Sequence, residues 1–116
     1  MFAQLQGNLR QAINLYEWLL RLSPRSRSLL MRLALALSRS SLDDAALETY
    51  EELLVIDPNH LGALRKLARL AMKRGNDAQA RQCFERLLQL HAGDIEAQQS
   101  LRNLDALGTI KKGFST

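Results

Sequence analysis

The sequence predicts an all-α fold of antiparallel helix pairs, and three observations support that prediction. Side chains of the same type recur at intervals of 34 residues, the signature of a two-helix unit that is copied and stacked. Leucine and alanine dominate the apolar residues, and this mix favours helix over strand. Apolar positions follow a helical period along the chain, with no alternating stretch typical of a strand. We therefore expect the pairs to stack into a right-handed α-solenoid.

The 34-residue period keeps its phase over three copies. One series is alanine, the next is aromatic and the third is leucine, and small residues and prolines recur at the same interval. These positions are Ala12, Ala46 and Ala80; Tyr16, Tyr50 and Phe84; Leu19, Leu53 and Leu87; Gly7, Ser41 and Gly75; and Pro24 and Pro58. A repetition that stays in phase indicates one continuous array.

Turn-forming residues set the limits of the first helices. The first is expected at 8–22, after Gly7 and before Ser23 and Pro24, while residues 1–6 are expected to end a preceding helix. The second is expected at 26–39, where Ser26 supplies a capping oxygen at its start. Because the connection between them is short, the two helices must run antiparallel.

The remaining helices follow the same logic. They are expected at 43–56, 60–74, 77–91 and 95–107, and the side chains proposed to cap them are Ser41, Asn59, Asn76 and Asp94. Pro58 falls in a connection, where its missing N–H group costs nothing. The last segment, 108–116, has little to bury and is expected to be a disordered tail.

Two stretches carry a family pattern almost completely. Residues 61–94 have the expected small and apolar residues at Leu64, Leu67, Ala68, Ala71, Gly75, Ala80, Phe84 and Leu87, and residues 27–60 have them at Leu30, Leu33, Ala34, Leu37, Ala46, Tyr50, Leu53 and Pro58. The chain resembles the tetratricopeptide repeat (TPR) family. The resemblance implies one TPR domain over 1–107, with a half repeat at 1–26, repeats at 27–60 and 61–94, and a terminal helix at 95–107.

Composition and charge narrow the possible partners. The net charge of +4, with twelve arginines and four lysines, is compatible with an acidic partner, with nucleic acid or simply with solubility. No window is apolar enough to cross a bilayer, and no secretory signal is visible at the N-terminus. Cys83 is the single cysteine, so no internal disulfide is possible. A cytoplasmic protein without membrane contact is expected.

The helix at 8–22 is more apolar than its later equivalents. Trp18, for example, stands where Glu52 and Arg86 stand in the next two copies. Either the chain begins inside a longer array, or the apolar face is a docking surface for a second chain or for a second copy. The residues predicted for this docking or oligomer face are Leu9, Ile13, Tyr16, Trp18 and Leu20.

By resemblance to the family, the first helix of each pair lines a concave groove that binds a ligand. The positions carried over as a partner-binding groove are Met31, Arg32, Leu35, Arg39, Arg65, Lys66, Arg69, Met72 and Lys73. Their basic character favours an acidic peptide, although a charge run on a helix can equally be a solvated face. The lysine and asparagine positions that hold a carboxylate in some family members are Met31 and Leu35 here, which disfavours binding of chaperone tails.

No catalytic or metal-binding constellation is visible. His60 and His91 fall in connections without a partner at ligand spacing, and Cys83 lies within a helix, so we expect solvated histidines and a packing or semi-exposed thiol. Neither an enzyme nor a cofactor is expected. Nucleic-acid binding is a weaker alternative, because the aromatics at 16, 50 and 84 are used in packing and leave no platform for stacked bases.

The sequence therefore predicts a non-enzymatic protein-interaction module. Its ligand would be a peptide or helix of a partner protein, held in the basic groove or on the apolar N-terminal helix. The alternative is a small TPR chaperone of a bacterial type III-like secretion system that shelters an export subunit, since short family members of about this length have that role.

Overall fold

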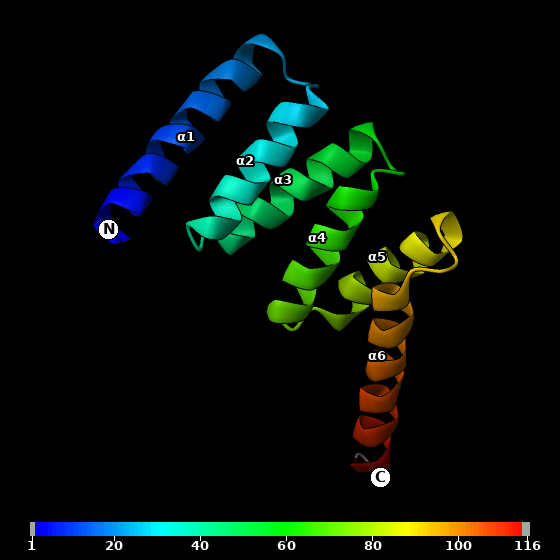
Figure 1. The fold of residues 1–116 in the computed structure, drawn as a ribbon. Helices are drawn as coiled ribbons and strands as arrows, with labels where there is room; N and C mark the ends of the chain where they lie inside the picture. Colours follow the sequence, from blue (N-terminus) through cyan, green and yellow to red (C-terminus); the bar gives the residue numbers. More distant parts are fainter. Residues whose placement is uncertain (1, 115–116) are drawn as a thin grey trace. The chain divides into compact units, whose positions relative to one another are not determined.

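A computed structural model describes the backbone of residues 2–114 and the side chains of residues 7–107. The chain divides into two compact units, of which unit 1 ends at Ala63 and unit 2 begins at Leu64. The helices are α1 (Phe2–Leu22), α2 (Arg27–Arg39), α3 (Asp43–Ile56), α4 (Leu61–Lys73), α5 (Asp77–Leu90) and α6 (Ile95–Phe114). The described residues contain no strand, as predicted (Figure 1).

Both ends of the chain differ from the prediction. Helix α1 runs without a break through Gly7, so residues 2–6 do not end a separate, preceding helix. Helix α6 continues to Phe114, where the sequence predicts an end near residue 107 and a disordered tail from 108. What the sequence predicts for Met1, Ser115 and Thr116 lies outside the described residues. The division into half repeats and full repeats stays a prediction.

Unit 1 is a three-helix layer in which α2 contacts both α1 and α3 (Figure 1). Its core combines small side chains with large ones that pack beside them. Ala34 and Ala46 are completely buried, which lets α2 and α3 approach closely, and Tyr50 and Leu53 fill the space beside them. Burial raises the pKa of the Tyr50 hydroxyl and keeps the ring neutral.

Unit 2 repeats this core 34 residues later. Ala68, Ala80, Phe84 and Leu87 are buried at the positions of Ala34, Ala46, Tyr50 and Leu53. Helix α5 contacts α6, and an ion pair of 2.8 Å joins Arg81 on α5 to Asp105 on α6. The periodicity in the sequence is therefore a periodicity of buried side chains.

Helices α2 and α4 end in the same type of turn. Leu42 N donates to Leu37 O, and Asn76 N donates to Ala71 O, so each bond closes the helix over a residue with positive φ. That residue is Gly75 with φ of 78° after α4, but Ser41 with φ of 62° after α2. Ser41 therefore holds a left-handed conformation that favours glycine, and it does not cap α3 as predicted.

The caps of α2, α4 and α6 recur with the 34-residue period. Ser26 accepts from Leu29 N at 3.3 Å, His60 Nδ1 accepts from Ala63 N at 3.0 Å, and Asp94 Oδ1 accepts from Ala97 N at 3.0 Å. The predictions for Ser26 and Asp94 are confirmed, as is Asn76 on α5. At the start of α4 the cap that accepts from Ala63 N is His60, the neighbour of the predicted Asn59, so His60 is more than a solvated histidine.

Candidate functional site

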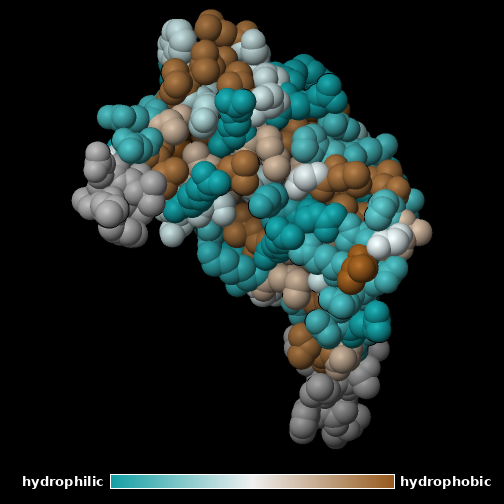
Figure 2. All heavy atoms as spheres, viewed as in Figure 1, coloured by the Kyte–Doolittle hydropathy of each residue, from teal (hydrophilic) through white to brown (hydrophobic). Residues whose placement is uncertain are grey.

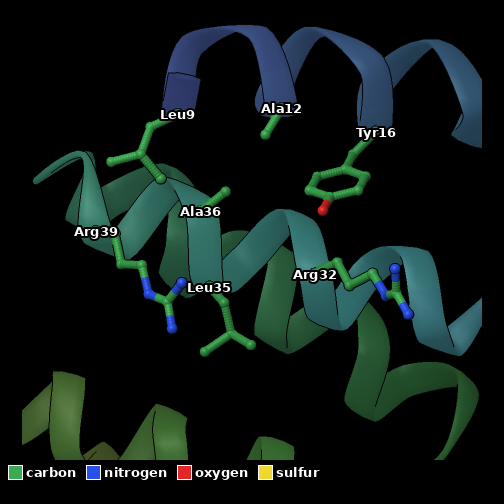
Figure 3. A pocket seen from close by; sticks show the side chains of 7 residues that line it. All are labelled: Leu9, Ala12, Tyr16, Arg32, Leu35, Ala36 and Arg39. Atoms are coloured by element: carbon green, nitrogen blue, oxygen red, sulfur yellow. The ribbon is translucent and has the colours of Figure 1, made fainter. Parts of the chain in front are cut away.

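A pocket of about 180 Å³ opens between α1 and α2 in unit 1 (Figure 3). Side chains at helical spacing on each element line it, so that one face of α1 meets one face of α2. The lining residues are Leu9, Ala12 and Tyr16 from α1, and Arg32, Leu35, Ala36 and Arg39 from α2. The pocket thus joins residues that the sequence placed in two separate predicted sites, the groove and the docking face.

The floor of this pocket is apolar and its rim is cationic. Ala12 and Ala36 leave the space, and the Tyr16 ring extends from α1 toward α2 (Figure 3). Arg32 and Arg39 are both exposed, and they lie on either side of Leu35 (Figure 3). Because they are seven residues apart on one helix, their Cα atoms are separated by about 10 Å along its axis.

Neither arginine of the pocket is neutralised by a side chain that the structure describes. Among the side chains that the structure describes, none forms an ion pair with Arg32 or Arg39. A guanidinium group binds a carboxylate through two parallel hydrogen bonds, so each is able to hold one acidic group. The arrangement suits an apolar side chain inserted between two carboxylates.

The arginines of unit 2 are arranged differently. Arg65 forms a two-pronged ion pair with Asp94, and its Nη1 atom also donates to Glu96 Oε2 at 3.0 Å. Arg69 donates from Nε to Glu96 Oε1 at 2.6 Å and from Nη2 to Glu96 Oε2 at 3.1 Å. These four residues form an ion cluster that ties α4 to the start of α6.

Asp94 is the central member of the ion cluster. Its side chain is only 6% exposed, and it both caps α6 and receives the Arg65 fork. The hydrogen bonds from Arg65 and from Ala97 N lower the pKa of Asp94 to about 2. The pKa of Glu96 is lowered mainly by its hydrogen bond from Arg69, and the pKa of Arg65 is raised by the two carboxylates.

The ion cluster changes what is expected of the predicted groove. Arg65 and Arg69 are the core of the basic strip in the sequence, yet their charges are balanced inside unit 2. Lys66 is half-buried, Met72 is 37% exposed and Lys73 is exposed on the same helix. Met31 in unit 1 lies against Gly62, with 3.5 Å between its Cε atom and a Cβ position built on that glycine. A ligand role for these residues stays a prediction.

The five residues of the predicted docking face of α1 lie in four different environments. Leu9 and Tyr16 line the pocket against α2, and Ile13 is buried at 8% exposure. Leu20 is half-buried. Of the five residues, only Trp18 points to solvent, with 55% of its surface exposed. Its exposed neighbours Leu15 and Leu22 are absent from the predicted set, although the helical wheel places them beside it.

The described side chains contain no group of three or more histidine, cysteine or acidic residues that could hold a metal ion. No helix among the described residues has both the length and the apolar character needed to span a membrane.

Comparison of the sequence with protein families gives two matches, both to the tetratricopeptide repeat. One covers residues 43–104, which is more than half of the chain, and the other covers residues 5–60. A search of curated protein sequences finds no match. The two family matches confirm the resemblance stated from the sequence.

Solved structures of similar fold include a TPR protein from Parabacteroides merdae, 25% identical over 86% of this chain with a TM-score of 0.79. The chain spans 39% of that protein. The secretion chaperone SycD of Yersinia enterocolitica, in complex with a peptide of the translocator YopD, is 16% identical with a TM-score of 0.77, covering 92% of this chain and 94% of SycD. The first TPR of RPAP3 bound to an HSP90 peptide is 20% identical with a TM-score of 0.75, covering 90% and 85% respectively. These likenesses confirm the all-α, TPR-like solenoid class.

Proposed function

The chain belongs to the tetratricopeptide repeat family, and we propose that it is a non-enzymatic, cytoplasmic module that binds an acidic peptide segment of a partner protein. The ligand would lie in the pocket between α1 and α2. Two proteins of similar fold were solved with peptides bound, which supports a peptide as the class of ligand.

One observation carries the choice of pocket. Arg32 and Arg39 flank an apolar floor and have no ion-pair partner among the described side chains, whereas Arg65 and Arg69 are balanced by Asp94 and Glu96. The binding free energy of an acidic ligand is most favourable at cations that are not already in an ion pair, because the ligand then displaces no existing ion pair. The apolar floor then adds the burial of one side chain.

The spacing of the arginines specifies a probe. A peptide in the polyproline II conformation has three residues per turn and advances about 3.1 Å per residue, so glutamates three positions apart lie on one side and span about 9 Å, close to the roughly 10 Å between the two arginines. We therefore choose a fluorescein-labelled octapeptide with two such glutamates and a leucine between them. In one control peptide alanine replaces the leucine, and in the other lysine replaces both glutamates.

Fluorescence anisotropy tests the proposal. We expect the octapeptide to bind, the double variant Arg32→Ala with Arg39→Ala to weaken binding about tenfold, and added salt to weaken it further. The matched control is Arg25→Ala, an exposed arginine in the α1–α2 connection that does not line the pocket. Equal affinity of the double variant and wild type, or equal binding of the lysine peptide, would contradict the proposal.

The second candidate is a chaperone that shelters an export subunit of a type III-like secretion system. Its support is that this chain and SycD cover one another over 92% and 94% of their lengths. Expression of tagged wild type and of the Arg32→Ala, Arg39→Ala variant in the native source would test it. A secreted subunit that co-purifies with wild type and is lost with the variant would favour the chaperone role; recovery of non-secreted proteins alone would exclude it.

The ion cluster argues against nucleic acid as the ligand. Arg65 and Arg69 are the centre of the basic strip, and their pairing leaves less positive charge for phosphates. A labelled single-stranded oligonucleotide is expected not to bind even at low salt. Binding that falls steeply with salt would revive this alternative.

A further inference from the structure

The pocket between α1 and α2 has two unlike ends. The helices are joined by residues 23–26 and run antiparallel. On α1, Leu9 and Tyr16 are seven residues apart. The same separation along the sequence divides Arg32 from Arg39 on α2, so the two spans match. Tyr16 therefore lies on the side of Arg32, and these two residues are called the Arg32 end (Figure 3). Leu9 lies on the side of Arg39, and these two are called the Arg39 end (Figure 3).

Tyr16 differs from its repeat equivalents in its exposure. Tyr50 and Phe84 occupy the same repeat position and are each only 1% exposed, so both pack in the core. Tyr16 is half-buried, lines the pocket and extends from α1 toward α2 with its hydroxyl group leading (Figure 3). A position that is used for packing in the later copies is therefore accessible to a ligand in the first.

A small side chain on α2 leaves the room beside the Tyr16 ring. This residue is Ala36, whereas the later copies have Leu70 and Leu104, both buried, at the same repeat position. A leucine would fill space that an alanine leaves open, because side chains in a core pack closely. In the space-filling view, apolar and hydrophilic surface lie side by side over α1 and α2, which agrees with a pocket of mixed character (Figure 2).

The Tyr16 hydroxyl is available to a ligand. Among the residues that the structure describes, none forms a hydrogen bond with it. A phenol hydroxyl donates one hydrogen bond, and a bond donated to a carboxylate is shorter and stronger than one to a neutral acceptor. A carboxylate has several lone pairs, so it can accept from Tyr16 and from the Arg32 guanidinium group at once. At the Arg39 end, Leu9 has no polar side-chain atom.

We propose that Tyr16 is the specificity-determining residue of the pocket, and that it donates a hydrogen bond to the ligand carboxylate bound by Arg32. The carboxylate at the Arg32 end is then held by two side chains, whereas the one at the Arg39 end is held by Arg39 alone. The two glutamates of the ligand are therefore not equivalent, and the peptide binds in one direction. This inference rests on the proposed function, because it concerns the same pocket and the same class of ligand.

Fluorescence anisotropy with the labelled octapeptide tests the role of the hydroxyl. Tyr16→Phe keeps the ring and its packing, and it should weaken binding about fivefold because a hydrogen bond to a charged group is lost. The matched control is Tyr50→Phe, the same change at the same repeat position in a residue that does not line the pocket. It should bind the peptide like wild type, and circular dichroism should show wild-type helicity for both variants.

Two further peptides, each with glutamine in place of one glutamate, test the assignment to Arg32. With one of them, Tyr16→Phe and Arg32→Ala should both lose most of their effect on the affinity, since the carboxylate that these side chains share is absent. With the other, Arg39→Ala should lose its effect and Tyr16→Phe should keep its own. The first of these peptides should also bind wild type more weakly than the second.

The affinities of the single arginine variants distinguish failure of this inference from failure of the proposed function. If Arg32→Ala and Arg39→Ala each weaken binding but Tyr16→Phe binds like wild type, the proposed function stands and the inference is overturned. A Tyr16→Phe effect that disappears with the same peptide as the Arg39→Ala effect would also overturn it, because the hydroxyl would then serve the other end. If the octapeptide does not bind, or neither arginine variant changes its affinity, the proposed function fails and the inference fails with it.

Discussion

The same repeat position is apolar in unit 1 and ionic in unit 2. Met31 lies against Gly62 in unit 1, with its Cε atom 3.5 Å from a Cβ position built on the glycine. In unit 2 the equivalent residues are Arg65 and Glu96, joined at 3.0 Å. The fold thus brings together the same two positions in each unit, while the chemistry of the contact is free to change.

The comparison also explains why a basic strip does not by itself mark a binding site. Arg65 and Arg69 look available when α4 is considered alone, but Asp94 and Glu96 lie at the start of the next helix pair and neutralise them. At the corresponding positions, 60 and 62, unit 1 has a histidine and a glycine. Arg32 and Arg39 of unit 1, which form no ion pair with a side chain that the structure describes, are the better candidates to meet an acidic partner.

Asp94→Ala should have the largest effect on the stability of the fold. It removes the cap of α6 and leaves Arg65 without its forked partner, and together these losses are expected to cost about 2–3 kcal/mol. Urea denaturation followed by circular dichroism measures the change. His60→Ala, at the equivalent capping position, should cost only about 1 kcal/mol because no ion pair is lost. Equal losses for the two variants would contradict the comparison.

The loss of stability at acid pH that comes from the ion cluster should be nearly as large as the effect of Asp94→Ala. The pKa of Asp94 falls from 3.8 to about 2 on folding, so its contribution of about 2 kcal/mol is present above pH 4 and is lost as the pH falls toward 2. The lowered pKa of Glu96 acts in the same direction. Unfolding free energies measured between pH 6 and 2 check this loss. Asp94→Asn keeps a capping oxygen but cannot titrate, and its stability should fall less over that range.

Transplanting the ionic contact into unit 1 should give a smaller effect. Met31→Arg combined with Gly62→Glu places opposite charges at the positions of Arg65 and Glu96, and we expect a favourable coupling of about 0.5–1 kcal/mol. A double-mutant cycle by urea denaturation isolates this energy from the single effects. The His60 ring, 3.2 Å from a Cβ position on Gly62, must move slightly in both variants that carry the glutamate. A coupling near zero would mean that the two units differ in geometry as well as in chemistry.

Ser41→Gly should have the smallest effect of these variants, and it should increase the stability of the protein. Ser41 has φ of 62°, and the equivalent residue in unit 2 is Gly75 with φ of 78°. Removing the Cβ atom from a left-handed position is expected to stabilise the protein by about 0.5 kcal/mol, after allowing for the greater freedom of the unfolded glycine. A small rise in the melting temperature checks the prediction, and Ser40→Gly, at a position with negative φ, is the control that should lower it.

Helical periodicity was enough to predict the fold class and most helix limits, because buried alanines, aromatics and leucines set the pattern. It failed at the two ends, where α1 runs through Gly7 and α6 runs past residue 107, because an isolated glycine such as Gly7 is tolerated inside a helix and does not by itself end one. The capping role of His60 at the start of α4 is not predicted from the sequence, because histidine is an unusual cap.

The candidate site was predicted only in pieces. Leu9 and Tyr16 were assigned to a docking face, and Arg32, Leu35 and Arg39 to a groove, although all five line one pocket. The five residues meet because of the way α1 is rotated about its axis relative to α2. This rotation cannot be read from the helical wheel of either helix alone. The ion cluster was missed for a similar reason, since Arg65 and Asp94 are 29 residues apart and meet only through packing. A search for opposite charges about one repeat apart could have found it.

The central claim is that the acidic peptide binds between α1 and α2 rather than along α4. An ¹H–¹⁵N correlation spectrum of the wild-type chain, titrated with the unlabelled octapeptide, tests it without any substitution. The account predicts that the largest shift changes fall on the backbone amides of residues 9–16 and 32–39. Changes concentrated on residues 65–73 instead would contradict it.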